Sequence, residues 1–492
     1  MLTKSTKVRM GLMGFAAAVA LAGCFGADKV ASPGEGGFIG GGGSSSGSSG
    51  SSDSSGAAAD CPTGLSNVGV IAGLRNCQLP NQINGNLVLK KLPGVIYSLS
   101  GRVSVGVDMG PNPDSVLPGG SKAILTIEPG VKIFGSSGSD FMIVQRGSQI
   151  FAEGTATSPI IFTSKQSVEG TTNVDSIGQW GGLVLAGRAP TNVCPAGVNP
   201  PNIACAEGQV EGANAVYGGN TPTDNSGILK YVRVQHSGFE VQPDKELNGI
   251  TFAGVGTGTV AEYIQVHNSS DDGIEMFGGT VNLKYIVLTG NDDDSFDTDN
   301  GWGGYGNGDE GGYVQFMILR QRENGGDRMF EMSSAGNKAL LSHPKIANAT
   351  LISRSNKSNE GLELNSDTKL DLYNSVIVVQ SPSAAACIRV VGTGTAPTFN
   401  GVRLSCGTKP FSTSSSGIGA TAIKAKFDAG TNNASEAVST LSGFTNGSNE
   451  NGVTRVALPG TFFQNVDYIG AVKNADDNWW KGWTCDLDGT AC

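Results

Sequence analysis

Short alternating runs of apolar and polar residues, bounded by turn residues, dominate the chain after about residue 120, and long amphipathic stretches are not found. A related pattern returns at residues 229–240, 261–268, 283–290, 314–321 and, more weakly, 348–354. Its aromatic positions, Tyr231, Tyr263, Tyr285 and Phe316, lie 32, 22 and 31 residues apart. An interval of 22 residues is about one coil of a parallel β-helix, and the longer intervals are one coil plus a loop.

Alternation within these runs separates an inner face from an outer face. The inner positions predict a stacked solenoid core and are Val232, Ile264, Ile286 and Met317, followed by Val234, Val266, Leu288 and Leu319. The opposite parity holds the four rings, which predicts an aromatic ladder on the outside. Lys230, Glu262, Lys284 and Gln315 align just before the rings and predict a stack of alternating charge.

The aromatic ladder has two interpretations. Flat apolar ring faces suit pyranose rings, so exposed stacked rings are a candidate sugar-binding platform. Stacking along rungs is also an ordinary way to stabilise a sheet, and we favour this second interpretation.

Other β-rich stretches, at residues 125–134, 141–146, 159–163, 370–379 and 387–391, extend the same pattern. We therefore predict an all-β chain folded as a right-handed parallel β-helix with capping segments and loop insertions. The predicted divisions are an N-terminal cap over 61–120 and a β-helix with a C-terminal cap over 121–492. A β-sandwich is the main competitor, and the period-matched core positions argue against it.

The amino terminus predicts export and a lipid anchor. Lys4, Lys7 and Arg9 precede an apolar run over residues 10–22 that is too short to span a bilayer, and the run leads into the lipobox Leu21-Ala22-Gly23-Cys24. We expect a signal peptide over 1–23, and diacylglycerol with fatty acids such as palmitate on Cys24. The Gly/Ser-rich stretch that completes residues 24–60 predicts a flexible linker. Because no aspartate stands directly beside Cys24, which is followed by Phe25 and Gly26, we expect the outer membrane, with the protein at the cell surface or extracellular.

The remaining cysteines number eight and form four close pairs in sequence. In an oxidising compartment an even count predicts disulfides, with nearest neighbours preferred among 105 possible connectivities. The preferred pairs are Cys61 with Cys77, Cys194 with Cys205, Cys387 with Cys406, and Cys485 with Cys492. With 33 basic against 43 acidic residues and a net charge of −10, the chain has no electrostatic case for binding nucleic acid.

A second repeat, of two residues, an apolar residue and an acid, follows the strands. Its acids would form a carboxylate column if the coils stack, and they are Glu240, Glu275, Asp297, Glu331 and Glu363. Like charges at the rung spacing of about 4.8 Å repel, so such a column needs cations, neighbouring bases or raised pKa values.

Calcium is the natural cation for this column, because it is a hard ion that takes oxygen ligands in irregular geometry. The predicted metal-ligating residues are Asp271, Asp272, Glu275, Asp293, Asp294, Asp297 and Asp299. The alternative is structural: some acids cap turns or pair with Arg320, Arg322 and Arg328. The chain's three histidines, His236, His267 and His343, come without a nucleophile motif, so a hydrolase triad is not supported, and we interpret His236 and His267 as structural.

Four segments together are familiar: residues 178–187 (Gly-Gln-Trp-Gly-Gly-Leu-Val-Leu-Ala-Gly), 271–275, 291–297 and 479–483, with Tyr217-Gly-Gly-Asn between the first two. They resemble a widespread, poorly characterised family of secreted or surface-attached bacterial right-handed β-helix lipoproteins. The resemblance spans roughly residues 90 to 485 and implies the fold, with no settled activity. More distantly, the coils are similar to those of pectate lyases, in which calcium-bound carboxylates neutralise a uronate and a Lys or Arg abstracts a proton.

Two functions follow as hypotheses. In the first, the β-helix is a non-catalytic surface module that binds a polysaccharide or a partner outer-membrane protein. In the second, it is a calcium-dependent polyuronate lyase, with aspartates of the predicted metal set on the calcium side and Arg320, Arg322 or Arg328 as base. An open acidic groove with an available base favours the lyase, and a flank filled by loops favours the binder.

Overall fold

The predicted alternation is present as two long sheets. The computed structural model describes residues 56–206, 208–210, 212–242, 245–380 and 386–492; the predicted signal peptide, Cys24 and most of the predicted linker lie outside them. Among the described residues, sheet A has seventeen strands: β1 (Ser66–Ile71), β2 (Leu74–Gln78), β4 (Gly85–Leu89), β5 (Val95–Leu99), β7 (Ala123–Ile127), β8 (Lys132–Gly135), β10 (Gln149–Glu153), β11 (Ile160–Ser164), β15 (Gly227–Gln235), β19 (Val260–His267), β21 (Leu283–Thr289), β23 (Tyr313–Arg320), β25 (Lys345–Ser353), β27 (Lys369–Tyr373), β28 (Val376–Val379), β30 (Ala396–Asn400) and β31 (Arg403–Ser405).

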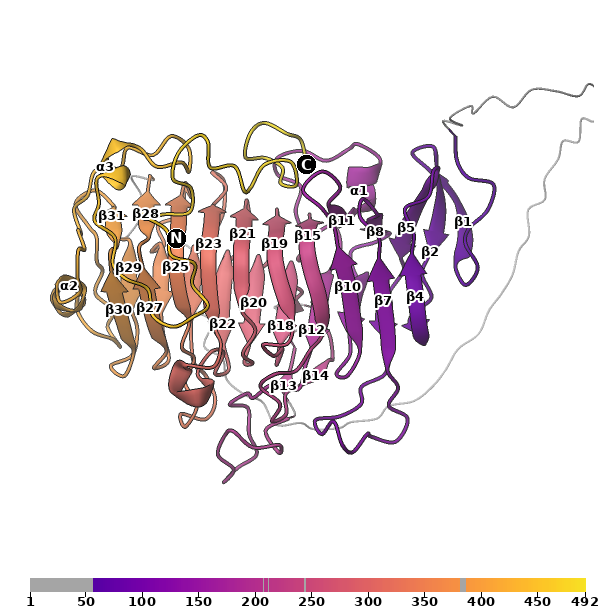
Figure 1. Cartoon of the computed structure of the whole chain (residues 1–492), viewed down its shortest axis with the longest axis horizontal. Coiled ribbons are helices and arrows are strands. Elements are labelled where there is room, and N and C mark those ends of the chain that lie inside the picture. The colour runs from indigo at the N-terminus through magenta and orange to yellow at the C-terminus, as the bar shows by residue number, and fades with distance from the viewer. Residues whose placement is uncertain (1–55, 207, 211, 243–244, 381–385) are drawn as a thin grey trace, which may run out of the picture. The chain divides into compact units, whose positions relative to one another are not determined.

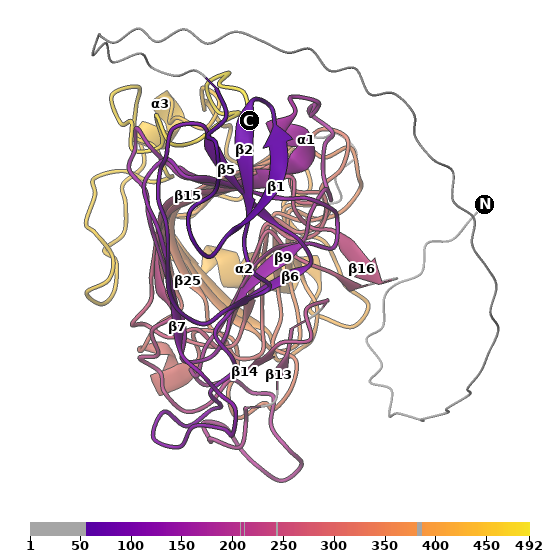
Figure 2. The ribbon, with the colours of Figure 1, turned by 90° about the vertical axis from the view of Figure 1, so that its right-hand side faces the viewer.

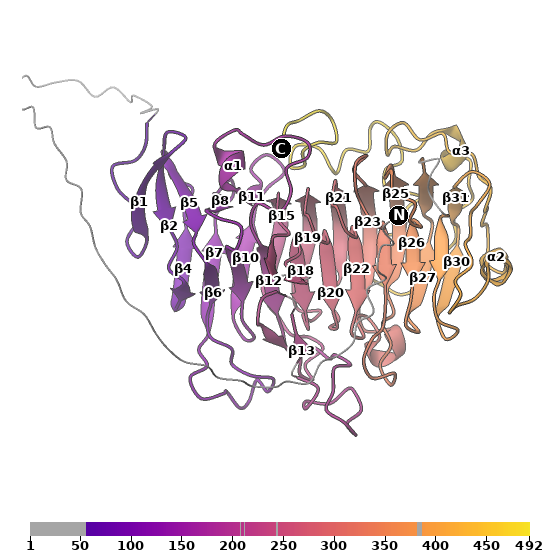
Figure 3. The same cartoon turned by 180° about the vertical axis from the view of Figure 1, so that it is seen from behind.

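Sheet B has ten strands in the described part, hydrogen-bonded in chain order: β3 (Gln82–Ile83), β6 (Arg102–Val105), β9 (Phe141–Val144), β12 (Gly182–Ala186), β18 (Ile250–Ala253), β20 (Ile274–Phe277), β22 (Phe296–Asp299), β24 (Phe330–Met332), β26 (Leu362–Leu364) and β29 (Ile388–Val390). Figure 1 shows the rungs side by side, Figure 2 shows β15 and β25 of sheet A on one side of the stack and β6 and β9 of sheet B on the other, and Figure 3 shows the stack from behind.

Each coil of the chain adds to sheet A and then to sheet B. The two short strands β10 and β11 both pair in parallel with β15, and β27 and β28 both pair in parallel with β25. Long sheet A strands in the middle of the stack therefore continue as pairs of short strands toward both ends. This arrangement confirms the parallel β-helix and excludes the sandwich, whose sheets would be antiparallel.

The core lies between the two sheets and contains the predicted inner positions. Val232, Ile264, Ile286 and Met317 are in register on successive strands and are fully buried. From sheet B the facing layer includes Phe296, which lies against Phe330 on the next rung. The parity inferred from the sequence is thus confirmed at these positions.

The aromatic positions sit at a bend in each sheet A strand. Tyr231, Tyr263, Tyr285 and Phe316 all have left-handed backbone conformations, with φ between 50° and 62°. Later rungs place Asn348, Asn374 and Gly401 in the same conformation. Bulky side chains rarely adopt this region, at a cost of about 1–3 kcal/mol each, so the bend must be stabilised by contacts elsewhere.

All four preferred disulfides are present. They join Cys61 to Cys77, Cys194 to Cys205, Cys387 to Cys406, and Cys485 to Cys492.

Caps and insertions complete the described part. The antiparallel β1–β2 hairpin lies at one end, and the first rung (β4, β5 and β6) already falls within residues 61–120. The helix α2 (Ala420–Asp428) packs Phe427 against Phe399 at the other end. Six further elements lie in insertions, namely α1 (Lys165–Val168), β13 (Gly208–Gln209), β14 (Val216–Tyr217), β16 (Glu240–Gln242), β17 (Lys245–Glu246) and η1 (Tyr305–Gly308), and α3 (Ser448–Asn451) follows α2. No helix within the described ranges has the length and apolarity to cross a membrane.

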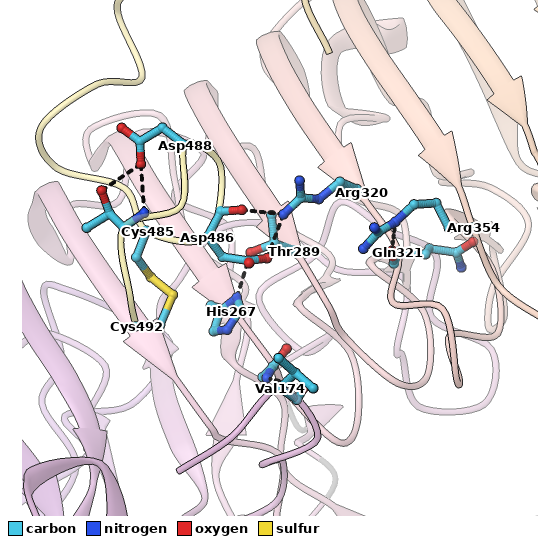
Figure 4. A network of polar contacts seen from close by, with 12 residues as sticks. Val174, His267, Thr289, Arg320, Gln321, Arg354, Cys485, Asp486, Asp488 and Cys492 are labelled. Carbon is cyan, nitrogen blue, oxygen red and sulfur yellow. Dashed lines mark hydrogen bonds and ion pairs between the residues drawn. A yellow bond between two sulfur atoms is a disulfide. The ribbon is translucent and has the colours of Figure 1, made fainter. Parts of the chain in front are cut away.

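After α2 the chain returns along the outside of sheet A, and we call residues 429–492 the C-terminal segment (Figure 1). Three side-chain amides hold this segment, those of Gln265 and Gln315 in sheet A and that of Asn374 between β27 and β28. Each donates to a backbone carbonyl of the segment and accepts from a backbone N–H. Near the chain end, Arg320 pairs with Asp486 beside the Cys485–Cys492 disulfide (Figure 4).

Candidate functional site

Four of the five predicted acids form a column on the outward face of sheet B. Glu275 is in register with Asp297, Asp297 with Glu331, and Glu331 with Glu363. The next rung continues the column with Arg389. We call these four acids the acid column.

Glu240 does not belong to the column, and this part of the prediction is wrong. It lies in β16, which forms a hairpin with β17, and Thr251 occupies the corresponding column position beside Glu275. The reason is a loop between β15 and β18, which carries Glu240 away before sheet B resumes at Ile250.

Two arginines neutralise one end of the column. Arg328 lies 3.3 Å from Glu331 and 3.0 Å from Glu363, and also 2.9 Å from Asp327. Arg389 lies 3.2 Å from Glu363. Burial by itself lowers the pKa of Arg328, but the surrounding carboxylates outweigh it and hold the pKa above the ordinary value.

Carboxylates crowd one another at the other end. Within each of three sets, the ligand oxygens all lie within 4.8 Å of one another, and the sets share Asp272 and Asp293. The sets are Asp271, Asp272 and Asp293; Asp272, Glu275 and Asp297; and Asp293, Asp294 and Asp327. We call them together the acid cluster.

Burial makes the charge in the acid cluster costly. The pKa of Asp272 is raised well above its usual value, first by burial and then by the neighbouring carboxylates. Burial also raises the pKa of Asp294, with Glu331 as the strongest neighbouring charge. A cation among these oxygens would lower the pKa values of Asp272 and Asp294, because it favours the charged form of each carboxyl group.

The donor set fits a hard divalent cation. Calcium takes six to eight oxygen ligands at about 2.3–2.6 Å and accepts irregular geometry. Each set offers three carboxylates, and the shared members Asp272 and Asp293 place the sets next to one another. Six of the seven predicted metal ligands belong to the cluster.

The seventh predicted ligand, Asp299, lies apart from these three sets. One of its side-chain oxygens accepts hydrogen bonds from the backbone N–H groups of Asn300 and Ala335, both at 2.6 Å. Asp299 ends β22 and ties the loop after that strand to the loop after β24.

Asp327 is a member of the cluster that the sequence prediction missed. It precedes Arg328-Met-Phe-Glu331 as Asp293 precedes Asp294-Ser-Phe-Asp297, so the repeat extends one position further back. At the following position the repeats have Asp272, Asp294 and then Arg328. The exchange of an aspartate for an arginine explains why the charge is balanced at one end of the column only.

The three candidate bases are held by carboxylates. Arg320 lies 2.6 Å from Asp486, and Arg322 lies 2.9 Å from Asp175 and 3.6 Å from Asp292. Arg328 bridges the acids described above. The structural alternative, in which acids of the column pair with these arginines, therefore holds for Arg328, whereas the closest partners of Arg320 and Arg322 lie outside the column.

The aromatic ladder is stacked as predicted and lies partly under the C-terminal segment. Successive ring centroids of Tyr231, Tyr263, Tyr285 and Phe316 are 4.3, 4.4 and 5.0 Å apart with nearly parallel planes. Trp483 meets the edges of the first two rings at 6.0 Å, and Trp479 packs at 5.3 Å from Tyr285. The tryptophans of the C-terminal segment therefore cover part of the ladder, while Tyr231, Tyr263 and Tyr285 remain half-buried, and this packing favours the stabilising interpretation.

The histidines make structural contacts. His236 Nδ1 donates to the carbonyl of Ser176 at 2.7 Å, and His267 Nδ1 lies 2.9 Å from the Thr289 hydroxyl. Burial lowers the pKa of both rings. His343 Nε2 lies 2.8 Å from Asp371. The sulfurs nearest His267 belong to the Cys485–Cys492 disulfide and are not available as metal ligands.

Comparison with known proteins places the fold in a family. Neither the curated proteins nor the solved structures gave a match. A family model described as a pectate-lyase like beta helix domain matches residues 116–484, which include the acid cluster, the aromatic ladder and most of the C-terminal segment. The chain belongs to this family of pectate-lyase-like β-helix proteins.

Proposed function

We propose that the protein is a lipid-anchored surface module whose β-helix binds an extracellular ligand without cleaving it, and whose acid cluster holds calcium. The observation that carries the proposal is the pairing of all three candidate bases, Arg320, Arg322 and Arg328, with carboxylates at 3.0 Å or less.

A lyase needs a base that accepts a proton in the reaction, and an efficient base has a pKa near the working pH. The carboxylates around Arg328 move its pKa in the opposite direction. Arg320 is turned toward the C-terminal segment, and Arg322 toward the loop that contains Asp175. This arrangement supports the binding module over the polyuronate lyase.

Calcium would serve the fold in this proposal. The cluster oxygens would hold the ion, and its charge would offset the repulsion between carboxylates on neighbouring rungs. The anchor is the second part of the proposal: Cys24 and the linker would tether the β-helix to the outer membrane, where it can meet a polysaccharide or an outer-membrane protein.

One assay separates the two functions. The full-length protein is incubated with polygalacturonate, alginate and other polyuronates, with calcium or with chelator, and the ultraviolet absorbance of the unsaturated product is followed. We expect no product in either condition. A calcium-dependent product, abolished by Arg328→Gln with the fold intact, would overturn the binding proposal in favour of the lyase.

The anchor has its own test. Cells that produce the protein are labelled with radioactive palmitate, and membranes are fractionated. Label is expected in the outer-membrane fraction for the wild type and not for Cys24→Ser. Equal label in both proteins would contradict lipidation of Cys24, and label confined to the inner membrane would contradict the outer-membrane location.

A further inference from the structure

A groove runs along the outward face of sheet A, away from the acid cluster on sheet B. It consists of two hollows of about 700 and 590 Å³ that share Tyr373 and Pro459. The loop that contains η1 borders the first hollow together with residues 459–462 of the C-terminal segment, and residues 455–459 border the second hollow. Each hollow falls within the range of roughly 300–1,000 Å³ typical of small-ligand sites.

The floor of the groove follows the β-helix axis. Tyr313, Lys345 and Asp371, which line the first hollow, are in register on β23, β25 and β27, and Asn400 of β30 lines the second hollow. Asn282, one rung before β23, accepts a hydrogen bond from the backbone N–H of Tyr313 at 3.0 Å. From Thr257 to Asn400 the lining reaches six rungs, which at about 4.8 Å per rung corresponds to about 24 Å. A groove of this length suits a chain better than a compact molecule.

Three aromatic rings line the groove. Tyr313, Tyr373 and Phe462 are half-buried, so part of each ring remains accessible. Tyr313 stacks on Phe462 with centroids 5.4 Å apart, and the Lys345 ammonium lies 5.1 Å from the centroid of the Tyr313 ring. Rings fixed in this way offer flat apolar surface at little entropic cost, which is the surface that the face of a pyranose ring packs against.

The polar groups of the groove are also held in place. Lys345 donates to the carbonyls of Gly303 and Gly311 at 2.7 and 2.9 Å. The Asp371 carboxylate lies 2.8 Å from His343 Nε2 and accepts from the Thr398 hydroxyl at 2.6 Å. Fixed donors and acceptors beside rings are the means by which a site orients a polyhydroxylated ligand.

The charge of the first hollow opposes an anionic ligand, whereas the second hollow is lined, among the described residues, by the cation Arg455 and by no acid. Asp309 and Glu310 are exposed at the rim of the first hollow, and Asp371 adds a third carboxylate on its floor. The Lys345 ammonium is turned toward two backbone carbonyls, and burial lowers its pKa to about 8. A polyuronate would meet like charge at the rim, whereas an uncharged sugar chain would not.

We propose that this groove binds a neutral polysaccharide chain, with Tyr373 and Phe462 as stacking rings and the Tyr313–Lys345–Asp371 floor as its polar guide. The inference rests on the proposed function, because it names the ligand site and ligand class of the surface module. It is separate from the calcium site, which lies on the other sheet.

The test is calorimetric titration of the full-length protein with cellohexaose, mannohexaose and maltohexaose, and with hexagalacturonate as the charged counterpart. At least one neutral hexasaccharide is expected to bind, and hexagalacturonate more weakly. Tyr373→Ala and Phe462→Ala are each expected to weaken binding about tenfold or more, since truncation of an aromatic anchor costs over about 1 kcal/mol.

Matched variants separate a lost site from a lost fold. Tyr373→Phe keeps the ring and should bind within about twofold of the wild type. Phe239→Ala removes a half-buried ring from a loop outside the groove lining, and should leave binding unchanged. Thermal unfolding of each variant then checks that the protein used in the titration is folded.

Two results would overturn the groove. One is that no neutral hexasaccharide binds, and the other is that Tyr373→Ala and Phe462→Ala bind as tightly as the wild type. If Asp272→Asn rather than Tyr373→Ala abolished saccharide binding, the groove would be wrong and the surface-module proposal would stand. A calcium-dependent lyase product would instead overturn that proposal itself.

Discussion

Sheet A and sheet B each carry a column of like side chains on the outward face, built by the same rung spacing. On sheet A the column consists of rings, with centroids 4.3–5.0 Å apart, under the C-terminal segment. On sheet B it consists of carboxylates, balanced by arginines at one end and crowded at the other. Rings on successive rungs attract one another, whereas carboxylates on successive rungs repel one another. Only the acid column therefore needs a counter-charge.

The comparison also separates two kinds of cover. The ring column is partly covered by the chain itself: the tryptophans of the C-terminal segment pack on it, and the amide contacts of Gln265, Gln315 and Asn374 hold the segment in place. The acid cluster relies on arginines at one end and, in our proposal, on calcium at the other. Removing a residue that covers the ring column is therefore expected to cost packing energy, whereas removing a counter-charge from the acid column is expected to cost electrostatic energy.

The largest expected effect comes from removing the cover of the ring column. Trp483 is fully buried and contacts Tyr231 and Tyr263, so Trp483→Ala should lower the free energy of unfolding by about 4 kcal/mol, as large-to-small changes of buried aromatics do. Urea unfolding followed by circular dichroism measures it.

Trp479→Ala is the matched control, because Trp479 is only partly buried and should cost less. A loss below about 1 kcal/mol for Trp483→Ala would mean that the segment does not stabilise the ring column.

The second effect tests the balanced end of the acid column. Arg328→Met removes a largely buried cation that three carboxylates share, and it should cost about 3 kcal/mol because the buried Glu363 and the partly exposed Asp327 and Glu331 all lose that partner. The measurement is again urea unfolding, at constant calcium.

Arg354→Met serves as its control. Arg354 pairs with the exposed Glu323, and a pair of this kind contributes between 0 and about 1 kcal/mol. Equal losses for the two variants would show that the acid column is no more sensitive to its counter-charge than an ordinary surface pair.

The third prediction concerns pH and calcium at the crowded end. Because the pKa values of Asp272 and Asp294 are raised in the fold, their ionisation opposes folding: without calcium, stability is lost as pH rises from about 4 through the raised pKa values. Calcium should then stabilise more at about pH 8 than at about pH 5, by about 2–3 kcal/mol at a concentration near one hundred times its Kd.

Differential scanning calorimetry with and without calcium at the two pH values checks this. Asp272→Asn keeps an oxygen for the backbone N–H of Asp294 but removes a shared ligand, so its metal-free protein should be more stable at about pH 8 and its response to calcium smaller. A calcium shift that is the same at both pH values, or unchanged in the variant, would place the effect outside the acid cluster.

Both columns could be predicted from the sequence where they depend on two local signals, the alternation of side chains along a strand and the regular spacing of the rungs. Parity predicted that Ile264 is inside and Tyr263 outside, and the repeated spacing predicted that Asp297 aligns with Glu331. The spacing failed at Glu240, because a loop of arbitrary length separates β15 from β18 and resets the register.

The sequence could not predict what covers each column. The contact of Trp483 with Tyr263 joins residues far apart in the chain, and the C-terminal segment has no rung periodicity that would place it on sheet A. The groove was missed for the same reason, since Tyr313 and Phe462 form one site only after the segment has docked. Nor does alternation indicate the left-handed bend at the ring positions.

The smallest expected effect tests whether the ring column depends on the charges beside it. Lys230 and Glu262 align as predicted, at 3.7 Å, but both side chains are more than a third exposed. Lys230→Met should therefore change the free energy of unfolding by less than about 1 kcal/mol, and by less still at high salt, because solvent and ions screen an exposed pair. Glu262→Gln should change the free energy of unfolding by a similar amount when both variants are measured by urea unfolding at two salt concentrations.

The Lys230 ammonium also lies 5.9 Å from the Tyr263 ring centroid, so a salt-independent loss of stability confined to Lys230→Met would be assigned to this contact with the ring. A loss above about 2 kcal/mol would show that the rings do not hold their column by stacking and cover alone.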